Sequence, residues 1–143
     1  MKDYISRTLP RDFRLRHNQR GNAMVEAALS LALFLMLLFG IMDFGRLIYS
    51  YNTLAHAARE GTRYALARGQ SSPTPATSTT IATLVQRQAV GLKPVTVTTT
   101  WTPDNKPGSL VQVQAQYTFN PILPYTKLTA ITLRSTSKMR ISQ

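Results

Sequence analysis

The sequence predicts an α+β fold in which a long N-terminal helix, membrane-spanning in its first half, packs on a small antiparallel β-sheet domain. Three observations predict this fold. Residues 21–42 form an apolar run of about twenty residues, the length that crosses a bilayer core as a helix. A helical period continues beyond that run. A period of two, typical of half-buried strands, appears in the last third of the chain.

Residues 1–21 are interpreted as a basic leader that lies outside the fold. Before Gly21, six basic residues stand against two acidic residues, so this segment carries +4 of the net charge of +11. A short basic flank stays on the cytoplasmic side of a membrane, which places the C-terminal part outside. An ordinary signal peptide is disfavoured, because Asp43 and Arg46, rather than a run of small residues, follow the apolar segment.

Residues 22–42 are the predicted transmembrane helix, and residues 43–69 continue it beyond the membrane. No proline lies between Asn22 and Pro73. Apolar residues recur at the helical intervals of three and four, namely Phe44, Leu47, Ile48, Tyr51, Leu54, Ala55 and Ala58. At 1.5 Å per residue, a continuous helix from Asn22 to Arg68 would extend roughly 70 Å.

Residues 70–79 are predicted to form a linker, because they are rich in Pro, Ser and Thr. Residues 80–143 are predicted to form a short helix and the sheet. We expect Thr79 or Thr80 to cap this helix, whose apolar face would hold Ile81, Leu84, Val85 and Ala89.

Alternation of apolar and polar residues predicts three strands in the last third of the chain. The first two form a hairpin, 95–101 and 111–119, around a turn at 103–108. The sequence NPILPY at 120–125 interrupts the sheet, and alternation resumes over 131–141. Threonines and glutamines occupy the polar face of the hairpin.

The charged residues of the long helix have structural interpretations. Asp43 with Arg46, and Glu60 with Arg63, are three residues apart and are predicted to pair on the helix surface. Glu26 is costly in an apolar helix unless it reaches the interface or finds a partner. One interpretation places it at the headgroup level, where it stabilises the positive N-terminus of the helix.

The beginning of the apolar run resembles the processing site of type IV pilin-like precursors, in which a basic leader ends in Gly and the fifth mature residue is Glu. Gly21 and Glu26 stand at those positions, with Asn22 as the first mature residue. The resemblance implies removal of residues 1–21 by a prepilin peptidase. It also implies the second interpretation of Glu26, in which the ammonium group of a neighbouring subunit's Asn22 pairs with Glu26 during assembly.

Residues 37–69 resemble the TadE-like (TadE/TadG) pseudopilins of the tight-adherence pilus system, type IVc. In that pattern a span ends in FG-x-x-[DE]-FGR and continues into N-x-hydrophobic-x-x-AAREG-x-RYA. The matching residues are Phe39, Gly40, Asp43, Phe44, Gly45, Arg46, Asn52, Ala57, Ala58, Arg59, Glu60, Gly61, Arg63, Tyr64 and Ala65. The resemblance covers roughly residues 20–69, and the ending Thr136–Arg140 is also similar to the family.

The resemblance implies a pilin-like fold and a structural, non-catalytic role as a minor pilin in the assembly, initiation or capping of a Tad-type adhesive pilus. The implied location is the bacterial inner membrane, with the C-terminal domain in the periplasm and a place in the extracellular pilus after assembly. The implied partners are a prepilin peptidase, the Tad inner-membrane assembly platform, other pilins or pseudopilins in a hetero-complex, and membrane lipid. No cofactor is implied.

Two other functions are weighed against this one. An uncleaved single-pass scaffold protein would keep its leader. A DNA-binding pseudopilin for uptake would bind phosphates through a basic patch, although the scattering of its residues along the chain disfavours nucleic acid. That patch would comprise Arg87, Lys93, Lys127, Arg134, Lys138 and Arg140. An enzyme is disfavoured because the sequence shows no catalytic triad, paired carboxylates, metal-ligand spacing or phosphate-binding loop.

Overall fold

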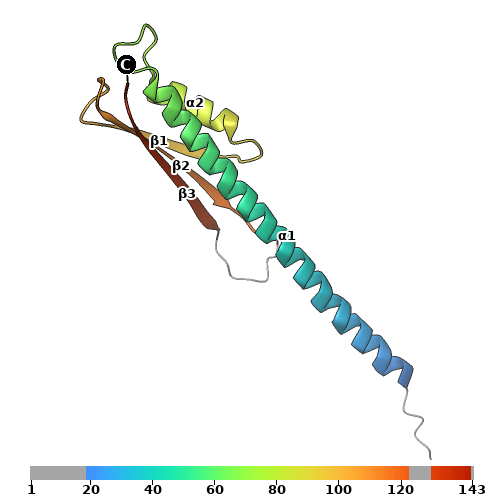
Figure 1. Ribbon diagram of the computed structural model, residues 1–143. Helices are drawn as coiled ribbons and strands as arrows, with labels where there is room; N and C mark the ends of the chain where they lie inside the picture. The colour runs from blue at the N-terminus through green and yellow to red at the C-terminus, as the bar shows by residue number, and fades with distance from the viewer. Residues whose placement is uncertain (1–18, 123–129, 143) are drawn as a thin grey trace, which may run out of the picture. The chain divides into compact units, whose positions relative to one another are not determined.

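The computed structural model describes residues 19–122 and 130–142. It contains two helices, α1 (Gln19–Leu66) and α2 (Ser78–Gln88), followed by three strands. The strands are β1 (Val95–Thr102), β2 (Leu110–Phe119) and β3 (Ile131–Arg140) (Figure 1). The predicted α+β layout, a long apolar helix packed on an antiparallel sheet, is confirmed. Lys127 and the second half of NPILPY, residues 123–125, lie outside the described residues.

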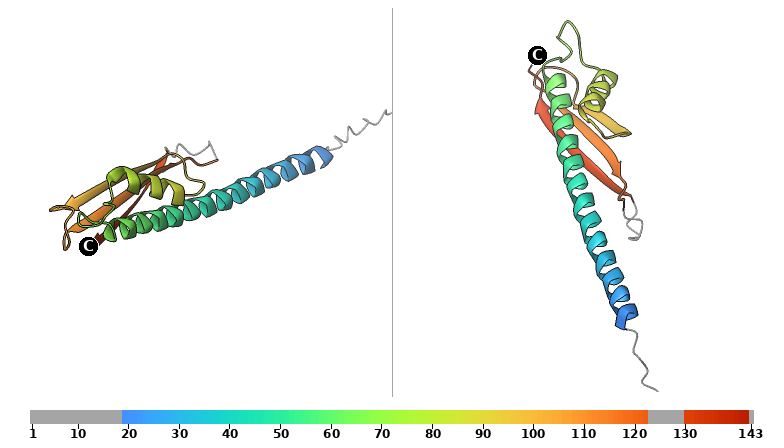
Figure 2. Two further views of the ribbon diagram at one scale, coloured as in Figure 1. Left: turned by 90° about the horizontal axis from the view of Figure 1, so that it is seen from above. Right: turned by 90° about the vertical axis from the view of Figure 1, so that its right-hand side faces the viewer.

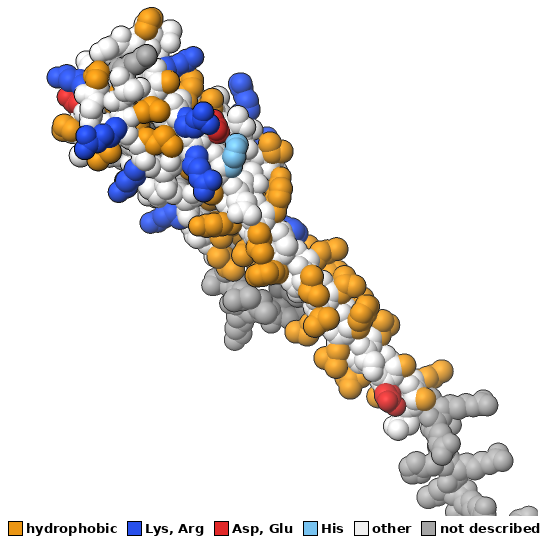
Figure 3. All heavy atoms as spheres, in the orientation of Figure 1, with side chains coloured by type: hydrophobic (Ala, Val, Ile, Leu, Met, Phe, Trp, Pro, Cys, Tyr) orange, Lys and Arg blue, Asp and Glu red, His pale blue; other side chains and the backbone are white. Residues whose placement is uncertain are grey.

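The described residues divide into two compact units, one up to residue 36 and one from residue 37 onward, and α1 begins in the first and ends in the second. In the first unit, the side chains from Gly21 to Met36 are exposed, and almost all of them are apolar. Figure 3 shows hydrophobic side chains covering this part of α1. By length and composition, α1 is the one described helix able to span a membrane, and its most apolar stretch is not buried within the chain. This apolar helix is consistent with membrane anchoring.

The sheet is antiparallel with the order β1-β2-β3, so β2 is central. Val97 pairs with Ala115, which in turn pairs with Ser135, so the odd-numbered residues of all three strands share one face. This face carries the buried residues of the sheet, among them Val95, Val111 and Val113, as the alternation predicted. The even-numbered residues form the opposite face.

The core lies between the odd-numbered face of the sheet and the two helices (Figures 1 and 2). α1 contributes small side chains and one large one, Leu54, whereas α2 contributes Ile81 and Val85. Trp101, Tyr117 and Leu133 pack against this cluster from the strands while remaining partly exposed. The second half of α1 is therefore a structural element of the sheet domain.

The N-cap of α2 is Thr77, so the prediction of Thr79 or Thr80 is wrong. Thr77 has an extended backbone, and its hydroxyl accepts a hydrogen bond from the Thr80 backbone N–H at 3.2 Å. Thr80 is the third residue of the helix, and its hydroxyl accepts from the Thr77 backbone N–H at 3.0 Å, which completes a capping box. Four consecutive threonines and serines, residues 77–80, precede the apolar face, so the sequence offers several alternative caps, and the packing of Ala76 into the core selects one of them.

Candidate assembly site on helix α1

The motif residues with small side chains form the buried face of α1. Ala57, Ala58 and Ala65 are fully buried, and Gly61 lies among them at helical spacing. A Cβ atom on Gly61 would lie 2.5 Å from Val85 Cγ2 of α2 and 3.4 Å from Val113 Cγ1 of β2. Glycine at this position therefore allows α2 and the sheet to approach α1 closely. These residues serve the internal packing of the domain.

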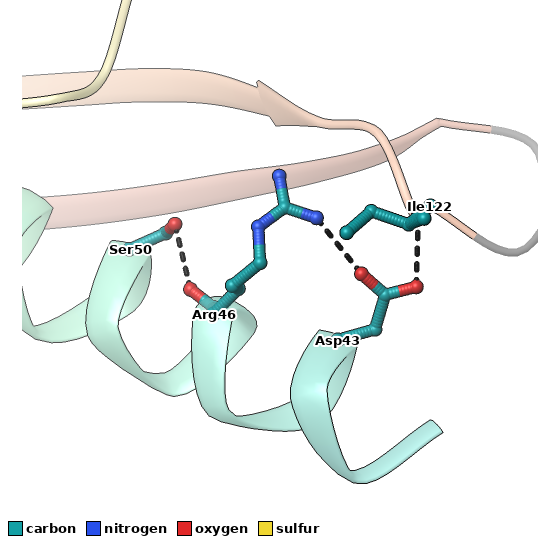
Figure 4. A network of polar contacts seen from close by, with 4 residues as sticks. All are labelled: Asp43, Arg46, Ser50 and Ile122. Atoms are coloured by element: carbon teal, nitrogen blue, oxygen red, sulfur yellow. Dashed lines mark hydrogen bonds and ion pairs between the residues drawn. The ribbon is translucent and has the colours of Figure 1, made fainter. Parts of the chain in front are cut away.

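Asp43 connects α1 to the end of strand β2. Its Oδ1 accepts a hydrogen bond from Arg46 Nη1 at 2.8 Å, and its Oδ2 accepts one from the Ile122 backbone N–H at 2.8 Å (Figure 4). Asp43 is only 9% exposed. The predicted pair with Arg46 is present and the Arg46 side chain is exposed as predicted, whereas the Asp43 carboxylate is largely buried, where its Oδ2 binds the segment after β2.

Arg46 completes this connection from the same turn of α1. Its guanidinium carbon lies 5.3 Å from the centre of the Phe119 ring, within the range of a cation–π contact. Phe119 is the last residue of β2 and is almost fully buried. The Arg46 backbone carbonyl also accepts a hydrogen bond from the Ser50 hydroxyl at 2.8 Å (Figure 4). Asp43 and Arg46 thus fix the end of the central strand on α1.

A third group of motif residues faces away from the domain. Gly45, Asn52, Arg59 and Arg63 follow one another at intervals of seven, seven and four residues, which places them on one stripe of the helix, and all four are exposed. We call these four residues the outer stripe. Within the described part of the chain, nothing lies within 4 Å of a Cβ built on Gly45. Arg63 is also 3.4 Å from Glu60, the predicted surface pair.

The remaining motif residues have mixed environments. Phe39 is 38% exposed and Phe44 is 64% exposed. Gly40 has open space around it. Tyr64 packs against the core while the Arg68 guanidinium lies 4.4 Å from its ring centre. In the first unit, Gly21, Asn22 and Glu26 all lie on α1 and are exposed.

The structure separates the residues of the predicted basic patch. Arg134, Lys138 and Arg140 share the even-numbered face of β3, whereas Arg87 lies on α2 and Lys93 lies in the segment before β1. Lys127 lies outside the described residues. Lys and Arg side chains are visible around the sheet domain in Figure 3. Of the predicted patch, only the three residues of β3 therefore lie together on one described surface.

Two hollows flank α2, and the residues lining them contain no carboxylate or histidine. The larger, of about 490 Å³, is lined by Gln86, Leu92, Lys93, Pro94 and Val95. The smaller, of about 330 Å³, is lined by Tyr64, Thr79, Thr80, Thr83, Leu84 and Arg87. Among residues 19–122 and 130–142, no group of three or more His, Asp or Glu residues is placed to hold a metal ion.

Sequence reasoning missed the partners of the motif residues on the sheet domain. Ile122 is 79 residues from Asp43, and it binds through its backbone N–H, which carries no side-chain signal. Phe119 ends the predicted strand 111–119 and is buried, but nothing in the local pattern indicated that Arg46 would lie over its ring. The contact between Gly61 and Val85 likewise requires the path of α2 to be known.

Residues 21–63 match the model of the TadE-like protein family. The matched region lies entirely on α1 and includes the buried small face, the Asp43–Arg46 pair and the outer stripe. The family resemblance is therefore confirmed over these residues. Tyr64, Ala65 and the ending Thr136–Arg140 lie beyond the match. Searches of curated proteins and of solved structures gave no match.

Proposed function

From the TadE-like character of residues 21–63, we propose that this chain is a structural, non-catalytic minor pilin or pseudopilin. The family match supports a pilin-like protein associated with the Tad pilus. The finer proposal is that the chain takes part in the assembly, initiation or capping of a Tad-type adhesive pilus. Its partners would be a prepilin peptidase, the Tad inner-membrane assembly platform and other pilins or pseudopilins.

The outer stripe is the observation that supports an assembly role. Within the domain, the small motif residues pack in the core, and Asp43 and Arg46 contact the end of β2 and the segment after it. The exposed Gly45, Asn52 and Arg59 have no such role: a Cβ on Gly45 would meet open space, and the side chains of Asn52 and Arg59 form no hydrogen bond or ion pair within the described part of the chain. An exposed glycine and polar residues at a spacing of seven suit the approach of a second helix. We assign this surface to contact with another pilin subunit.

Processing and location follow from the same proposal. Cleavage between Gly21 and Asn22 would leave the apolar part of α1 at the mature N-terminus, anchored in the inner membrane with the sheet domain in the periplasm. Glu26 would then be the fifth residue of the mature chain, four residues after the new ammonium group of Asn22. In a bundle of such helices, the ammonium of one subunit would pair with the Glu26 carboxylate of another, which removes the cost of an isolated charge in the membrane.

The mature N-terminus tests the proposal directly. The protein is recovered from cells that carry the matching prepilin peptidase, and its intact mass and terminal sequence are determined. A chain beginning at Asn22 is expected. A chain that keeps residues 1–21 would instead support the uncleaved membrane scaffold.

Glu26→Ala tests assembly separately from processing. We expect the variant to fold and to reach the membrane fraction at normal levels, but to be depleted from sheared pili. Ser30→Ala, one helical turn along, is the matched control. Equal amounts of the Glu26 variant and wild type in the pili would contradict an assembly role for this carboxylate.

A further inference from the structure

The even-numbered face of the sheet is a polar surface apart from Leu110 at one end, and we call it the outer sheet face. Both helices pack on the opposite face, so no other described element covers it. The strand register aligns its residues in rows, and each row runs from β1 through β2 to β3. The rows are Thr96–Gln116–Arg134, Thr98–Gln114–Thr136, Thr100–Gln112–Lys138 and Thr102–Leu110–Arg140.

The charge of this face is entirely positive. Arg134, Lys138 and Arg140 are exposed, and none of them forms an ion pair within the described part of the chain. The four rows contain no Asp or Glu. At about 3.3 Å per strand residue, Arg134 lies about 13 Å from Lys138, and Lys138 lies about 7 Å from Arg140. These unpaired cations along one edge strand complement a polymer that carries negative charges at repeated intervals.

The uncharged part of the face indicates which polyanion fits. Threonine hydroxyls and glutamine amides both donate and accept hydrogen bonds, as the hydroxyl groups of sugars do. The aromatic residues of the strands, Trp101, Tyr117 and Phe119, are odd-numbered and face the core. Single-stranded nucleic acids are usually held by bases stacked on exposed aromatic rings, and this face offers none.

We propose that the outer sheet face binds an acidic polysaccharide, with the carboxylates of uronate residues on Arg134, Lys138 and Arg140 and the sugar hydroxyls on the threonines and glutamines. This surface is distinct from the outer stripe of α1, and the proposal does not rest on a role in pilus assembly. A protein of this form would attach to an acidic polymer through the sheet and to its membrane or filament through α1.

The test measures binding of polygalacturonate to the full chain held in nanodiscs of zwitterionic lipid, which removes competing anionic lipid. The variant Arg134→Gln/Lys138→Gln/Arg140→Gln is expected to bind at least tenfold more weakly than wild type. The control Arg87→Gln/Lys93→Gln/Lys106→Gln removes the same charge from other surfaces and is expected to change the affinity less than twofold. Binding of the wild type should weaken as salt is raised, because exposed charges are screened.

Other probes decide the class of polymer. Neutral dextran and a single-stranded oligonucleotide of equal charge are each expected to bind at least tenfold more weakly than polygalacturonate. Gln114→Glu places an acid in the middle of the face without removing a cation and should also weaken binding. Equal binding by the triple variant and its control would overturn the proposal. An oligonucleotide that binds as well as polygalacturonate would overturn its assignment to polysaccharide.

Discussion

The Asp43 carboxylate accepts a hydrogen bond from the Ile122 backbone N–H at 2.8 Å, which joins α1 to a segment 79 residues later in the chain. Asp43 also pairs with Arg46, whose guanidinium lies over Phe119. One acidic side chain on the helix thus holds the end of the central strand. This contact gives a structural reason for an Asp followed three residues later by an Arg.

Asp43→Ala is expected to lower the free energy of unfolding by about 1–3 kcal/mol, because the Ile122 N–H and the Arg46 guanidinium both lose a charged acceptor. Asp43→Asn keeps an oxygen for Ile122 and should cost less. The measurement is denaturant unfolding of the full chain in micelles, followed by the fluorescence of Trp101, the only tryptophan. Identical unfolding curves for Asp43→Ala and wild type would show that the connection does not contribute to stability.

Gly61→Ala is expected to destabilise the domain by about 1–3 kcal/mol, since its Cβ would lie 2.5 Å from Val85 Cγ2 and force α2 to shift. Val85→Ala in the same chain should recover part of this loss by removing the clashing methyl group. Gly45→Ala is the matched control, because a Cβ there meets open space. That change should stabilise the helix by up to about 1 kcal/mol. Equal effects of the two substitutions would contradict the close contact between α1 and α2.

Arg59→Glu/Arg63→Glu is expected to reduce incorporation into pili at least severalfold while leaving unfolding of the domain unchanged. Both side chains are exposed on the outer stripe, so reversing their charge alters the surface and leaves the core intact. Arg87→Glu/Lys93→Glu makes the same change in charge on another surface and should assemble normally. The ratio of protein in sheared pili to protein in membranes gives the result. Normal incorporation of the Arg59/Arg63 variant would show that the outer stripe is not a surface used in assembly.

Asp104 is expected to titrate below its ordinary range. The Ser109 hydroxyl donates to Oδ1 at 2.6 Å and holds the pKa of this carboxyl down, with further help from Lys106 through its backbone N–H at 3.2 Å. Because the folded pKa is lowered, the ionised carboxylate stabilises the fold above the unfolded pKa of about 3.9, and this contribution is lost as the pH falls through the folded pKa.

NMR titration of the carboxyl carbons measures this pKa. Ser109→Ala should raise the pKa of Asp104 towards its ordinary value, and Lys106→Gln should raise it less. An unchanged pKa in Ser109→Ala would show that the hydroxyl is not its main cause. In unfolding experiments, the difference in the free energy of unfolding between wild type and Asp104→Asn should shrink as the pH is lowered from 5 through the folded pKa of Asp104.

The periodicity of apolar residues predicted the helices and strands, because it follows from which side of each element is buried. Alternation placed Val95, Val111 and Val113 on the buried face of the sheet, and helical spacing placed Leu54 and Ala58 in the core. The motif predicted the match to the TadE-like family model and its place on the helix. The partners of Asp43, Arg46 and Gly61 were not predictable, since each arises where distant segments meet. The choice of Thr77 as the N-cap also depended on packing, in this case of its neighbour Ala76.

The sheet domain holds α1 at two separate places, which has a mechanical consequence. Asp43 binds Ile122 near one end of the domain, and the Leu66 carbonyl accepts a hydrogen bond from the Ser142 backbone N–H at 3.4 Å near the other. These attachments are 23 residues apart on the helix, about 35 Å at 1.5 Å per residue. A pull on α1 along its axis would load both attachments and the packed core between them in shear, so the domain would have to yield as a whole. A fibre subunit that bears tension through its helix would gain mechanical resistance from this arrangement.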